Sequence, residues 1–288
     1  MIIVKILGGL GNQLFQYAAG RRLAQIRNTK LLLDISAYET YKLHNYSLHY
    51  FNIKEAIATE RDLGLFIKNN TYQSIMRRLN RFIPSKYKRF VFEKPHSRFI
   101  PDVLALGNKA YLDGYWQNEN YFKDIRDILL WEFTLKEPLG PDDARIEKEI
   151  AEHNSVSLHI RRGDYVQNQK TNQKYGTCSL DYYHQAINHI TKIIHNPRFF
   201  IFSDDIQWVK DNLKVKNCEY IDHDASKNYV DLILMSRCKH NIIANSSFSW
   251  WGAWLNSNPQ KIIIAPKKWF AIGQYNNTEL VLDNWVKL

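Results

Sequence analysis

Cysteine is scarce in this chain. The 288 residues include three cysteines, Cys178, Cys218 and Cys238. They are too few and too widely spaced for a zinc cluster or a disulfide framework. This excludes the small disulfide-stapled class of protein and leads us to expect a reducing compartment.

Long apolar runs are also missing. No stretch reaches the length of about 18 apolar residues that a membrane-spanning helix needs. Residues 1–7 are apolar but short, and they lead directly into a glycine-rich loop instead of forming a signal peptide. We therefore expect a cytoplasmic, bacterial type of enzyme without a Golgi-type anchor.

Two common nucleotide-binding motifs are incomplete. The loop that begins at Gly8 and Gly9 has Asn12 and Gln13 where a dinucleotide fingerprint would place its third glycine, and it lacks the lysine of a P-loop. A Rossmann oxidoreductase or methyltransferase is therefore disfavoured. The glycines still allow close backbone approach to a ligand, although a tight turn without a ligand is an equal alternative.

Positive charge is in excess. The chain has 39 Lys and Arg against 29 Asp and Glu, a net charge of +10, which favours an anionic partner such as a nucleotide, a nucleic acid or a lipid surface. Much of it lies in residues 75–98, where interleaved apolar side chains are compatible with a peripheral membrane contact or with a solvated helix face. We find no recognised nucleic-acid-binding motif and expect no nucleic-acid partner.

The pattern of apolar segments predicts two α/β domains, residues 1–140 and 141–288, separated by a segment rich in proline, glycine and charge. The first domain reads as strand, glycine loop, helix and strand, followed later by a strand at 110–118 and a helix at 121–131. The second predicts a doubly wound parallel sheet. Its expected strands are 155–160, 198–202, 218–221, 241–244 and 261–265, and its expected helices are 181–194, 206–212, 227–238 and 250–256.

Ligands of open parallel sheets bind beyond the carboxyl ends of the strands. The loop after the strand at 155–160 carries Arg161 and Arg162, whose guanidinium groups suit a diphosphate. Asp164 would fix one of them. A plain surface ion pair is the alternative. After the next strand come Asp204 and Asp205, and the alternative there is a cap for the helix beginning at Ile206.

A third polar loop follows the strand at 241–244. Asn245, Ser246, Ser247 and Ser249 exceed what capping a helix requires, so a second phosphate contact is expected there. Asp222, His223 and Asp224 resemble a metal-binding motif, but they also fit a loop with a helix cap. Because the arginines already supply positive charge, we expect no metal.

Five motifs together resemble the alpha-1,2-fucosyltransferases of glycosyltransferase family 11. They occur in the family's order and span nearly the whole chain. The motifs are residues 8–18 (GGLGNQLFQYA), 114–117 (GYWQ), 159–165 (HIRRGDY), 202–205 (FSDD) and 231–252 (DLILMS through NSSFSWWG).

The resemblance implies a GT-B fold, in which two Rossmann-like domains face each other across a cleft. It implies inverting transfer of L-fucose from GDP-fucose to the 2-hydroxyl of a terminal beta-galactoside, with no cofactor or metal. The acceptor would be a galactose-terminated oligosaccharide, either soluble or lipid-linked as in O-antigen assembly. The alternatives are a related GDP-sugar transferase with another acceptor or linkage, or a non-transferase Rossmann enzyme.

The resemblance also implies roles for individual residues. Arg161 would bind the GDP diphosphate and, with Asn12, act in catalysis. The remaining donor-binding residues would be His159, Asp164, Asp204, Asn245, Ser246, Ser247 and Phe248. The residues facing the sugar and acceptor would be Gly9, Gly11, Asn12, Gln13 and Trp116. The motifs do not identify the catalytic base. By their location in the first domain, the candidates are Asp34, Asp113 and Glu119.

Overall fold

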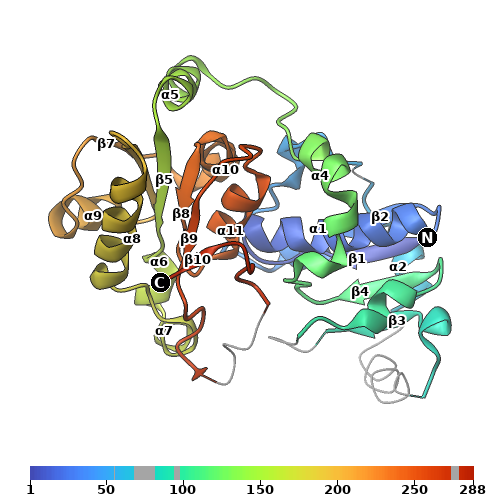
Figure 1. Ribbon diagram of the computed structural model, residues 1–288. Helices are drawn as coiled ribbons and strands as arrows, with labels where there is room; N and C mark the ends of the chain where they lie inside the picture. Colours follow the sequence, from blue (N-terminus) through green and yellow to red (C-terminus); the bar gives the residue numbers. More distant parts are fainter. Residues whose placement is uncertain (55, 68–81, 94–97, 274–278) are drawn as a thin grey trace. The chain divides into compact units, whose positions relative to one another are not determined.

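The computed structural model describes residues 1–54, 56–67, 82–93, 98–273 and 279–288. The chain forms two compact units, Met1–Lys136 (unit 1) and Glu137–Leu288 (unit 2). Each unit contains its own parallel β-sheet (Figure 1). The predicted domain boundary after residue 140 coincides with the start of the first helix of unit 2.

Unit 1 is built on a parallel sheet with the strand order β2-β1-β4-β3. The apolar side chains of β1 and β4 are buried, and the first helix, α1, packs on the sheet. A Cβ added to Gly20 of α1 would lie 3.0 Å from Leu31 and 3.1 Å from Val4, so glycine lets α1 lie directly on β1 and β2. The strands are β1 (Ile2–Lys5), β2 (Leu31–Asp34), β3 (Phe90–Phe92) and β4 (Ala110–Asp113).

Short helical segments fill most of the remainder of unit 1. The prediction of one helix over 121–131 is only partly right, because Phe122 takes an extended φ of −151° that interrupts the helix and buries its ring. The described helices are α1 (Leu10–Ile26), α2 (Glu60–Gly64) and α4 (Arg126–Glu132). The described 3-10 turns are η1 (Ser36–Glu39), η2 (Leu48–Tyr50), η3 (Ser85–Tyr87), η4 (Pro101–Ala105), η5 (Glu119–Tyr121) and η6 (Lys123–Ile125).

A buried ion pair joins α1 to α4. The Nε atom of Arg21 lies 2.8 Å from Oε1 of Glu132, and the two side chains are 6% and 1% exposed. The hydroxyl of Tyr17 donates to Oε2 of the same carboxylate at 2.7 Å. Burial and the neighbouring Glu132 raise the pKa of Tyr17 far above its ordinary value, so the hydroxyl keeps its proton as a donor.

Unit 2 has the strand order β10-β9-β8-β5-β6-β7, with all neighbouring pairs parallel. Numbered from β5, this is the order 3-2-1-4-5-6 of a Rossmann fold. The doubly wound sheet and its five predicted strands are confirmed, and a sixth strand is added. The strands are β5 (Ser155–Ile160), β6 (Arg198–Ser203), β7 (Cys218–Ile221), β8 (His240–Ile242), β9 (Ile263–Ala265) and β10 (Val286–Lys287).

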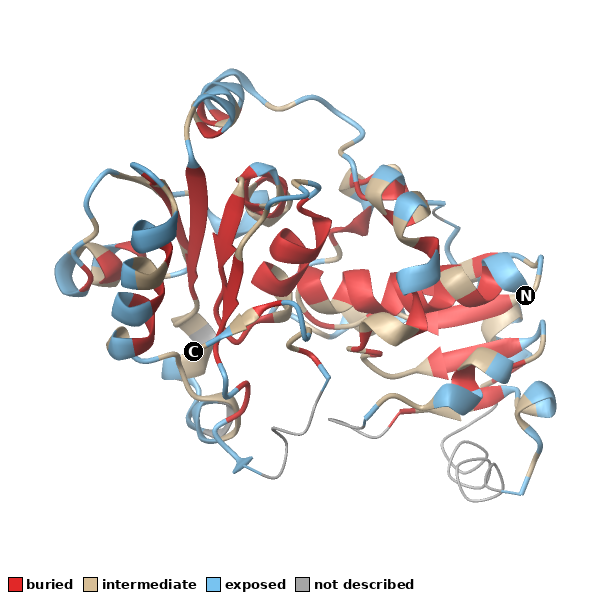
Figure 2. Cartoon of the chain, in the orientation of Figure 1, coloured by how far each residue is buried: buried red, intermediate tan, exposed pale blue. Residues whose placement is uncertain are grey.

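Helices cover both faces of this sheet, so the side chains of its central strands are buried on both sides. All six residues of β5 are buried (Figure 2). One core includes Tyr183 of α8, and a second includes Leu234 of α10. The described helices are α5 (Pro141–Glu152), α6 (Gly163–Gln167), α7 (Gln169–Tyr175), α8 (Leu180–Ile193), α9 (Ile206–Asn212), α10 (Asn228–Arg237) and α11 (Ser247–Leu255), with a 3-10 turn η7 (Ala225–Lys227).

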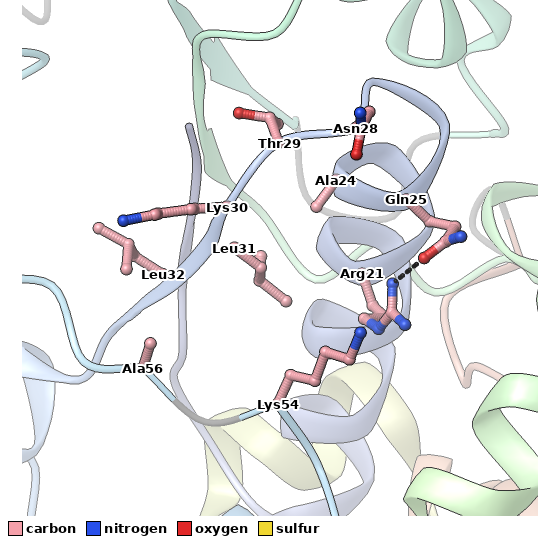
Figure 3. A pocket seen from close by; sticks show the side chains of 10 residues that line it. All are labelled: Arg21, Ala24, Gln25, Asn28, Thr29, Lys30, Leu31, Leu32, Lys54 and Ala56. Atoms are coloured by element: carbon pink, nitrogen blue, oxygen red, sulfur yellow. Dashed lines mark hydrogen bonds between the residues drawn. The ribbon is translucent and has the colours of Figure 1, made fainter.

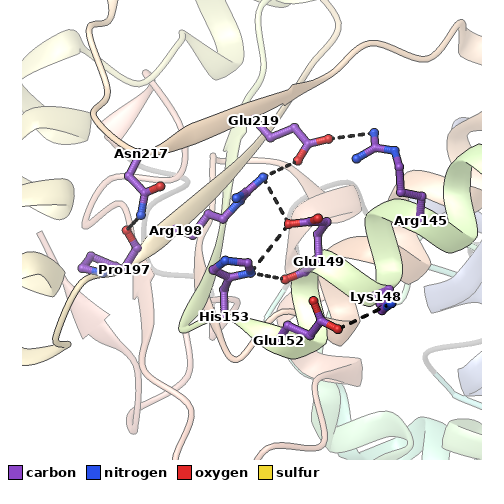
Figure 4. A network of polar contacts seen from close by, with 9 residues as sticks. All are labelled: Arg145, Lys148, Glu149, Glu152, His153, Pro197, Arg198, Asn217 and Glu219. Carbon is purple, nitrogen blue, oxygen red and sulfur yellow. Dashed lines mark hydrogen bonds and ion pairs between the residues drawn. The ribbon is translucent and has the colours of Figure 1, made fainter.

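An ion-pair network fastens α5 to the sheet of unit 2 (Figure 4). Arg198, at the start of β6, lies 3.0 Å from Glu219 of β7 and 3.3 Å from Glu149 of α5. Arg145 of α5 also pairs with Glu219 at 3.0 Å. Burial opposes ionisation of Glu219, but these two arginines lower its pKa overall. The network lies at the amino end of β6, away from the carboxyl ends where ligands bind, so it serves the fold.

The proposed membrane segment, residues 75–98, lies largely outside the described residues. Within its described part, Tyr87 is 64% exposed and Lys86 lies 4.8 Å from the centre of that ring. Phe82 is 73% exposed. Throughout the described parts of the chain, we find no helix that combines the length and the apolar character needed to cross a bilayer.

Candidate active site

The sheet of unit 2 has a switch point between β5 and β8. Strands β6 and β7 extend to one side of it, and β8, β9 and β10 extend to the other. At such a point the loops after the two adjacent strands diverge and leave a crevice for a ligand. The loops that meet this condition are residues 161–162, which lead into α6, and residues 243–246, which lead into α11.

Arg161 and Asp204 form the central ion pair of this edge. Nη1 of Arg161 lies 3.0 Å from Oδ2 of Asp204, with the side chains 21% and 26% exposed. Oδ1 of the same carboxylate accepts a hydrogen bond from the backbone N–H of Arg162 at 2.8 Å. Asp204, just after β6, therefore positions the loop after β5. A guanidinium has five N–H donors in one plane, so a group held this way can also bind a phosphate.

Gly163 allows this carboxylate to approach. A Cβ at this position would lie 2.5 Å from Oδ2 and 3.0 Å from Cγ of Asp204, so any larger residue would have to push the carboxylate or the loop aside. The next side chain, Asp164, lies outside the described part of the structure. Its place in the nucleotide pocket stays a prediction.

The side chain of Arg162 has different partners from that of Arg161. Its guanidinium carbon lies 3.5 Å from the centre of the Trp208 ring on α9, and its Nε lies 3.3 Å from Oδ2 of Asp205. Asp205 also accepts a hydrogen bond from the backbone N–H of Trp208 and so caps α9. The helix-cap alternative for Asp205 is confirmed, and the two arginines do not form one clamp.

His159 packs in the site as an uncharged ring. Its side chain is buried, and its ring makes an edge contact with Phe248 of α11 at 5.6 Å between centroids. Burial lowers the pKa of His159 to about 4, against an opposing effect of Asp204 and with a small addition from Arg161. The imidazole is therefore neutral at pH 7. Two predicted donor-binding residues from opposite sides of the switch point thus come together.

The start of α11 supplies a helix N-terminus at the same edge. The Ser246 hydroxyl accepts a hydrogen bond from the backbone N–H of Phe248 at 3.3 Å and caps the helix. Because of this cap, the helix begins at Ser247, one turn before the predicted start at Trp250. Its first turn contains no acidic residue, so the positive end of its dipole is not neutralised locally.

Asn245 positions the neighbouring loops. Its Nδ2 lies within 3.1 Å of the carbonyl oxygens of Tyr175, Gly176 and Trp269, and the residue is 3% exposed. With its hydrogens directed at these carbonyls, the amide is not available for the predicted phosphate contact. Ser246 and Ser247 are the predicted donor-binding residues that remain at the turn.

The sheet of unit 1 has its own switch point, between β1 and β4. Gly8 has φ +90°, which only glycine adopts without strain, and it turns the chain from β1 into α1. Nε2 of Gln117, after β4, donates to Oδ1 of Asn12 at 2.7 Å. Gly9 and Asn12 are half-buried here, so the structure leaves these two predicted sugar-facing residues at the ligand edge.

Three residues predicted to face the sugar are buried. Gln13 has no exposed surface, donates to the carbonyls of Gly8 and Asn45, and accepts from the backbone N–H of Ser47 at 2.9 Å. Trp116 is fully buried, and Gly11 is buried within the first turn of α1. These residues support the turn from inside unit 1, and their contact with the sugar stays a prediction.

The three residues predicted as candidates for the catalytic base differ in solvent exposure. Asp34 is 3% exposed and accepts hydrogen bonds from the Tyr111 hydroxyl at 2.5 Å and from the hydroxyl and N–H of Ser36. It therefore supports the sheet edge from inside. Asp113 lies 3.5 Å from Lys5 with 17% of its side chain exposed, and Glu119 is half-buried.

The metal alternative at Asp222, His223 and Asp224 finds little support in the geometry. The His223 ring bridges two carboxylates, with Nδ1 2.6 Å from Asp231 and Nε2 2.9 Å from Asp143. Asp224 caps η7 through the backbone N–H of Ser226. Among the residues that the structure describes, no group of three or more His, Cys, Asp or Glu has a metal-binding arrangement.

Unit 1 also has a pocket at the far end of α1, with a volume of about 370 Å³ (Figure 3). It lies where α1 ends and β2 begins, so it is at the amino end of β2 and remote from the glycine turn. Its lining residues are Arg21, Ala24, Gln25, Asn28, Thr29, Lys30, Leu31, Leu32, Lys54 and Ala56. The arginine already pairs with Glu132.

One residue that supports the site, Glu93, is not predicted from the sequence. Glu93 is 6% exposed, and Oε2 accepts hydrogen bonds from the backbone N–H groups of Tyr115 and Trp116, both at 2.7 Å. It thereby fixes the turn after β4, where Trp116 has φ +55°. Nothing in the sequence near Glu93 indicates this contact, because its partners lie more than twenty residues away.

Two Rossmann-like units with ligand edges at their switch points define a GT-B glycosyltransferase fold. A crystal structure of NodZ alpha-1,6-fucosyltransferase soaked with GDP-fucose has the same fold, with a TM-score of 0.55, 16% identity, and coverage of 91% of this chain and 94% of that one.

Residues 4–288 match the model of glycosyl transferase family 11, and the chain belongs to this family. An alpha-1,2-colitosyltransferase of Escherichia coli is 37% identical over 100% of this chain and 99% of that protein. The O-antigen biosynthesis glycosyltransferase WbnK of Escherichia coli is 34% identical over 98% of each. The family predicted from the five motifs is confirmed.

Proposed function

We propose that this chain transfers L-fucose from GDP-fucose to the 2-hydroxyl of a terminal beta-galactoside, with inversion at the anomeric carbon and without a metal ion. The observation that carries the proposal is the Arg161–Asp204 pair at the switch point of unit 2, beside the start of α11. Membership of glycosyl transferase family 11 and the names of the relatives support the class of reaction and the alpha-1,2 linkage.

In the proposed mechanism, Arg161 binds the diphosphate of the donor. As the bond between the sugar and GDP breaks, negative charge grows on the leaving phosphate, and the fixed guanidinium stabilises it. The N–H groups at the start of α11 and the hydroxyl of Ser247 would contact the other phosphate. Such preorganised groups take the role that a metal ion has in other transferases, because Asp204 holds Arg161 in position before the donor binds.

The acceptor hydroxyl attacks the face of the sugar opposite to the leaving GDP, which inverts the anomeric centre. Its proton passes to a base or to the departing phosphate. Asn12, tied to Gln117 at the glycine turn, is proposed to orient the transferred sugar. Asp113 is the more accessible of the two aspartates suggested as base, because Asp34 is buried and bonded to Tyr111 and Ser36.

A second donor has a specific observation in its favour. The relative that is 37% identical is named an alpha-1,2-colitosyltransferase. Colitose is fucose without its 3-hydroxyl, so one pocket could admit both sugars unless it hydrogen-bonds or excludes that hydroxyl. A site that hydrogen-bonds a hydroxyl discriminates strongly against the analogue that lacks it.

The test is release of GDP from GDP-fucose and from GDP-colitose, with and without lactose, in excess EDTA and in added Mn²⁺. We expect lactose-stimulated release from GDP-fucose that EDTA leaves unchanged. Loss of activity in EDTA would overturn metal independence. If Asp222→Asn or Asp224→Asn then removed the response to Mn²⁺, the metal would be placed there. Faster turnover of GDP-colitose would reassign the donor.

We further propose that the natural acceptor is a galactose-terminated oligosaccharide on a lipid carrier, reached by peripheral binding of residues 75–98 to an anionic membrane. The exposed Phe82 and Tyr87 beside basic residues support this. Cosedimentation with anionic vesicles at low salt tests it. Protein that remains in the supernatant under those conditions would contradict it.

A further inference from the structure

An unbroken chain of six aromatic rings lies between β2 and the end of η2. In the order of their contacts the rings are His44, Tyr41, Tyr38, Tyr46, His49 and Tyr50. Neighbouring centroids are 4.0–6.2 Å apart. We call residues 38–50 the aromatic segment. Of its six rings, that of His49 is exposed and the other five are half-buried, so together they form a surface instead of a core.

One end of this ring chain lies against the glycine turn. A Cβ built on Gly9 would contact the His44 ring at 3.5 Å, and the Tyr38 hydroxyl donates to the carbonyl oxygen of Gly8 at 2.7 Å. The first and third rings of the chain, His44 and Tyr38, therefore lie at the ligand edge of unit 1, and the row of ring contacts continues from Tyr38 to Tyr46.

Buried residues of unit 1 fix the backbone of the aromatic segment. Gln13, buried in α1, donates to the carbonyl of Asn45 and accepts from the N–H of Ser47. Leu48 has no exposed surface. Burial raises the pKa of Tyr38 well above its ordinary value, so its hydroxyl stays protonated as a donor to Gly8. A surface fixed in advance loses little entropy when a ligand binds.

We propose that the aromatic segment is a binding subsite for the acceptor oligosaccharide, accommodating sugars beyond the residue that is modified. This inference rests on the proposed function. Sugar rings present apolar C–H faces that pack on aromatic rings, and tyrosine and histidine add polar atoms at the rim for hydroxyl groups. A continuous row of six rings beside the glycine turn offers more contact area to an extended neutral chain than to a compact monosaccharide.

The experiment compares two acceptors, lactose and a galactose-terminated tetrasaccharide, by calorimetric titration of the full chain in the presence of GDP. Tyr46→Ala and His49→Ala should each weaken tetrasaccharide binding about threefold to tenfold, because their rings follow Tyr38 in the row of contacts. Binding of lactose and of GDP should stay within about twofold of the unaltered protein. Tyr46→Phe, which keeps the ring, should retain most of the affinity.

The matched control is Trp131→Ala, which removes an exposed ring of unit 1 on α4, and it should leave both acceptors unaffected. Equal weakening of lactose and tetrasaccharide by Tyr46→Ala and His49→Ala would show a general structural effect and overturn the inference, as would unchanged binding of both. Because the titration requires no turnover, it decides this point separately. A chain that transferred no sugar from either donor would contradict the proposed function alone.

Discussion

Two arginine–carboxylate pairs, one from each unit of this glycosyl transferase family 11 protein, have similar lengths but different surroundings. In unit 1, Arg21 and Glu132 are 2.8 Å apart, with 6% and 1% of their side chains exposed. In unit 2, Arg161 and Asp204 are 3.0 Å apart and remain 21% and 26% exposed. The first pair joins two helices, and the second lies at the carboxyl ends of β5 and β6.

Exposure and position together separate a pair that serves the fold from a pair suited to a ligand. The Arg198–Glu219 pair is about as exposed as Arg161–Asp204 but lies at the amino end of β6. Removing one partner of a fully buried pair leaves an uncompensated charge in a medium of low dielectric. A partly exposed arginine keeps contact with water and can exchange it for a phosphate. Unit 1 presents amides, aromatic rings and the Lys5–Asp113 pair at its ligand edge, whereas unit 2 presents the guanidinium of Arg161 at its own.

The largest effect expected concerns the buried pair. Glu132→Gln removes the charge that compensates Arg21 and should lower the free energy of unfolding by about 3–5 kcal/mol, measured by urea denaturation. The control is Asp124→Asn, which breaks the Arg22–Asp124 pair of unit 1, 2.8 Å long with Asp124 48% exposed. It should cost less than about 1 kcal/mol. Equal costs would remove the contrast between buried and exposed pairs.

Arg161→Ala should lower activity strongly and the free energy of unfolding only slightly. We expect kcat for GDP release to fall about 100- to 1,000-fold, equivalent to roughly 3–4 kcal/mol of barrier, because a preorganised donor to the leaving group is lost. The free energy of unfolding should change by only about 1 kcal/mol, since the pair is partly exposed.

The control for this change is Arg145→Ala, which removes an arginine of unit 2 that is 59% exposed and paired with Glu219. It should leave kcat unaltered. Retained activity in Arg161→Ala, or a loss of activity explained by unfolding, would assign the pair in unit 2 to the fold as well.

The ligand edge of unit 2 contains a buried imidazole that should make stability sensitive to acid. Burial lowers the pKa of His159 to about 4. Its contribution to stability is complete above its ordinary pKa of 6.5 and is lost as pH falls toward 4, because the unfolded state binds the proton more readily.

His159→Gln should therefore lose less stability than the unaltered protein between pH 6.5 and 4, by up to about 3 kcal/mol. Urea denaturation at a series of pH values measures this. His195→Gln, an exposed histidine of the same unit, should follow the unaltered protein. Parallel curves for the His159 variant would mean that the buried imidazole accepts a proton without penalty.

Most of unit 2 could be predicted from the sequence, for a physical reason. A strand buried on both faces is usually rich in apolar residues, and β6 contains such a run, FFIF. In β5 apolar residues alternate with Ser155, Ser157 and His159, and all six residues are buried. The polar residues that follow them had to lie at one edge, because parallel strands end together. The predicted start of α11 at Trp250 is one turn late, because several polar residues at this turn could cap the helix and the actual cap is Ser246.

Unit 1 was harder to predict because its polar side chains turn inward. A sequence pattern shows that Gln13 and Trp116 flank glycine turns, but it does not show whether a side chain near a turn points to solvent. Gln13 is buried, and its hydrogen bonds are completed by the nearby carbonyl of Gly8 and by backbone groups of the distant residues Asn45 and Ser47. The aromatic segment is not evident from the sequence for a related reason. Its rings form one row only because the fold brings Tyr38 against Tyr46, which are not neighbours in the sequence.

The smallest effect expected tests the carboxylate next to Asp204. Asp205 caps α9 and lies 3.3 Å from Arg162, so by its contacts it serves the fold although it adjoins the site. Asp205→Ala should lower the free energy of unfolding by about 1 kcal/mol, the usual cost of losing a helix cap, and leave the KM for GDP-fucose unchanged. Asp204→Asn should instead raise that KM, because Arg161 would lose the partner that positions it. If Asp205→Ala raised the KM as much as Asp204→Asn, the site would extend to Arg162 and α9, and unit 2 would bind its donor with both arginines.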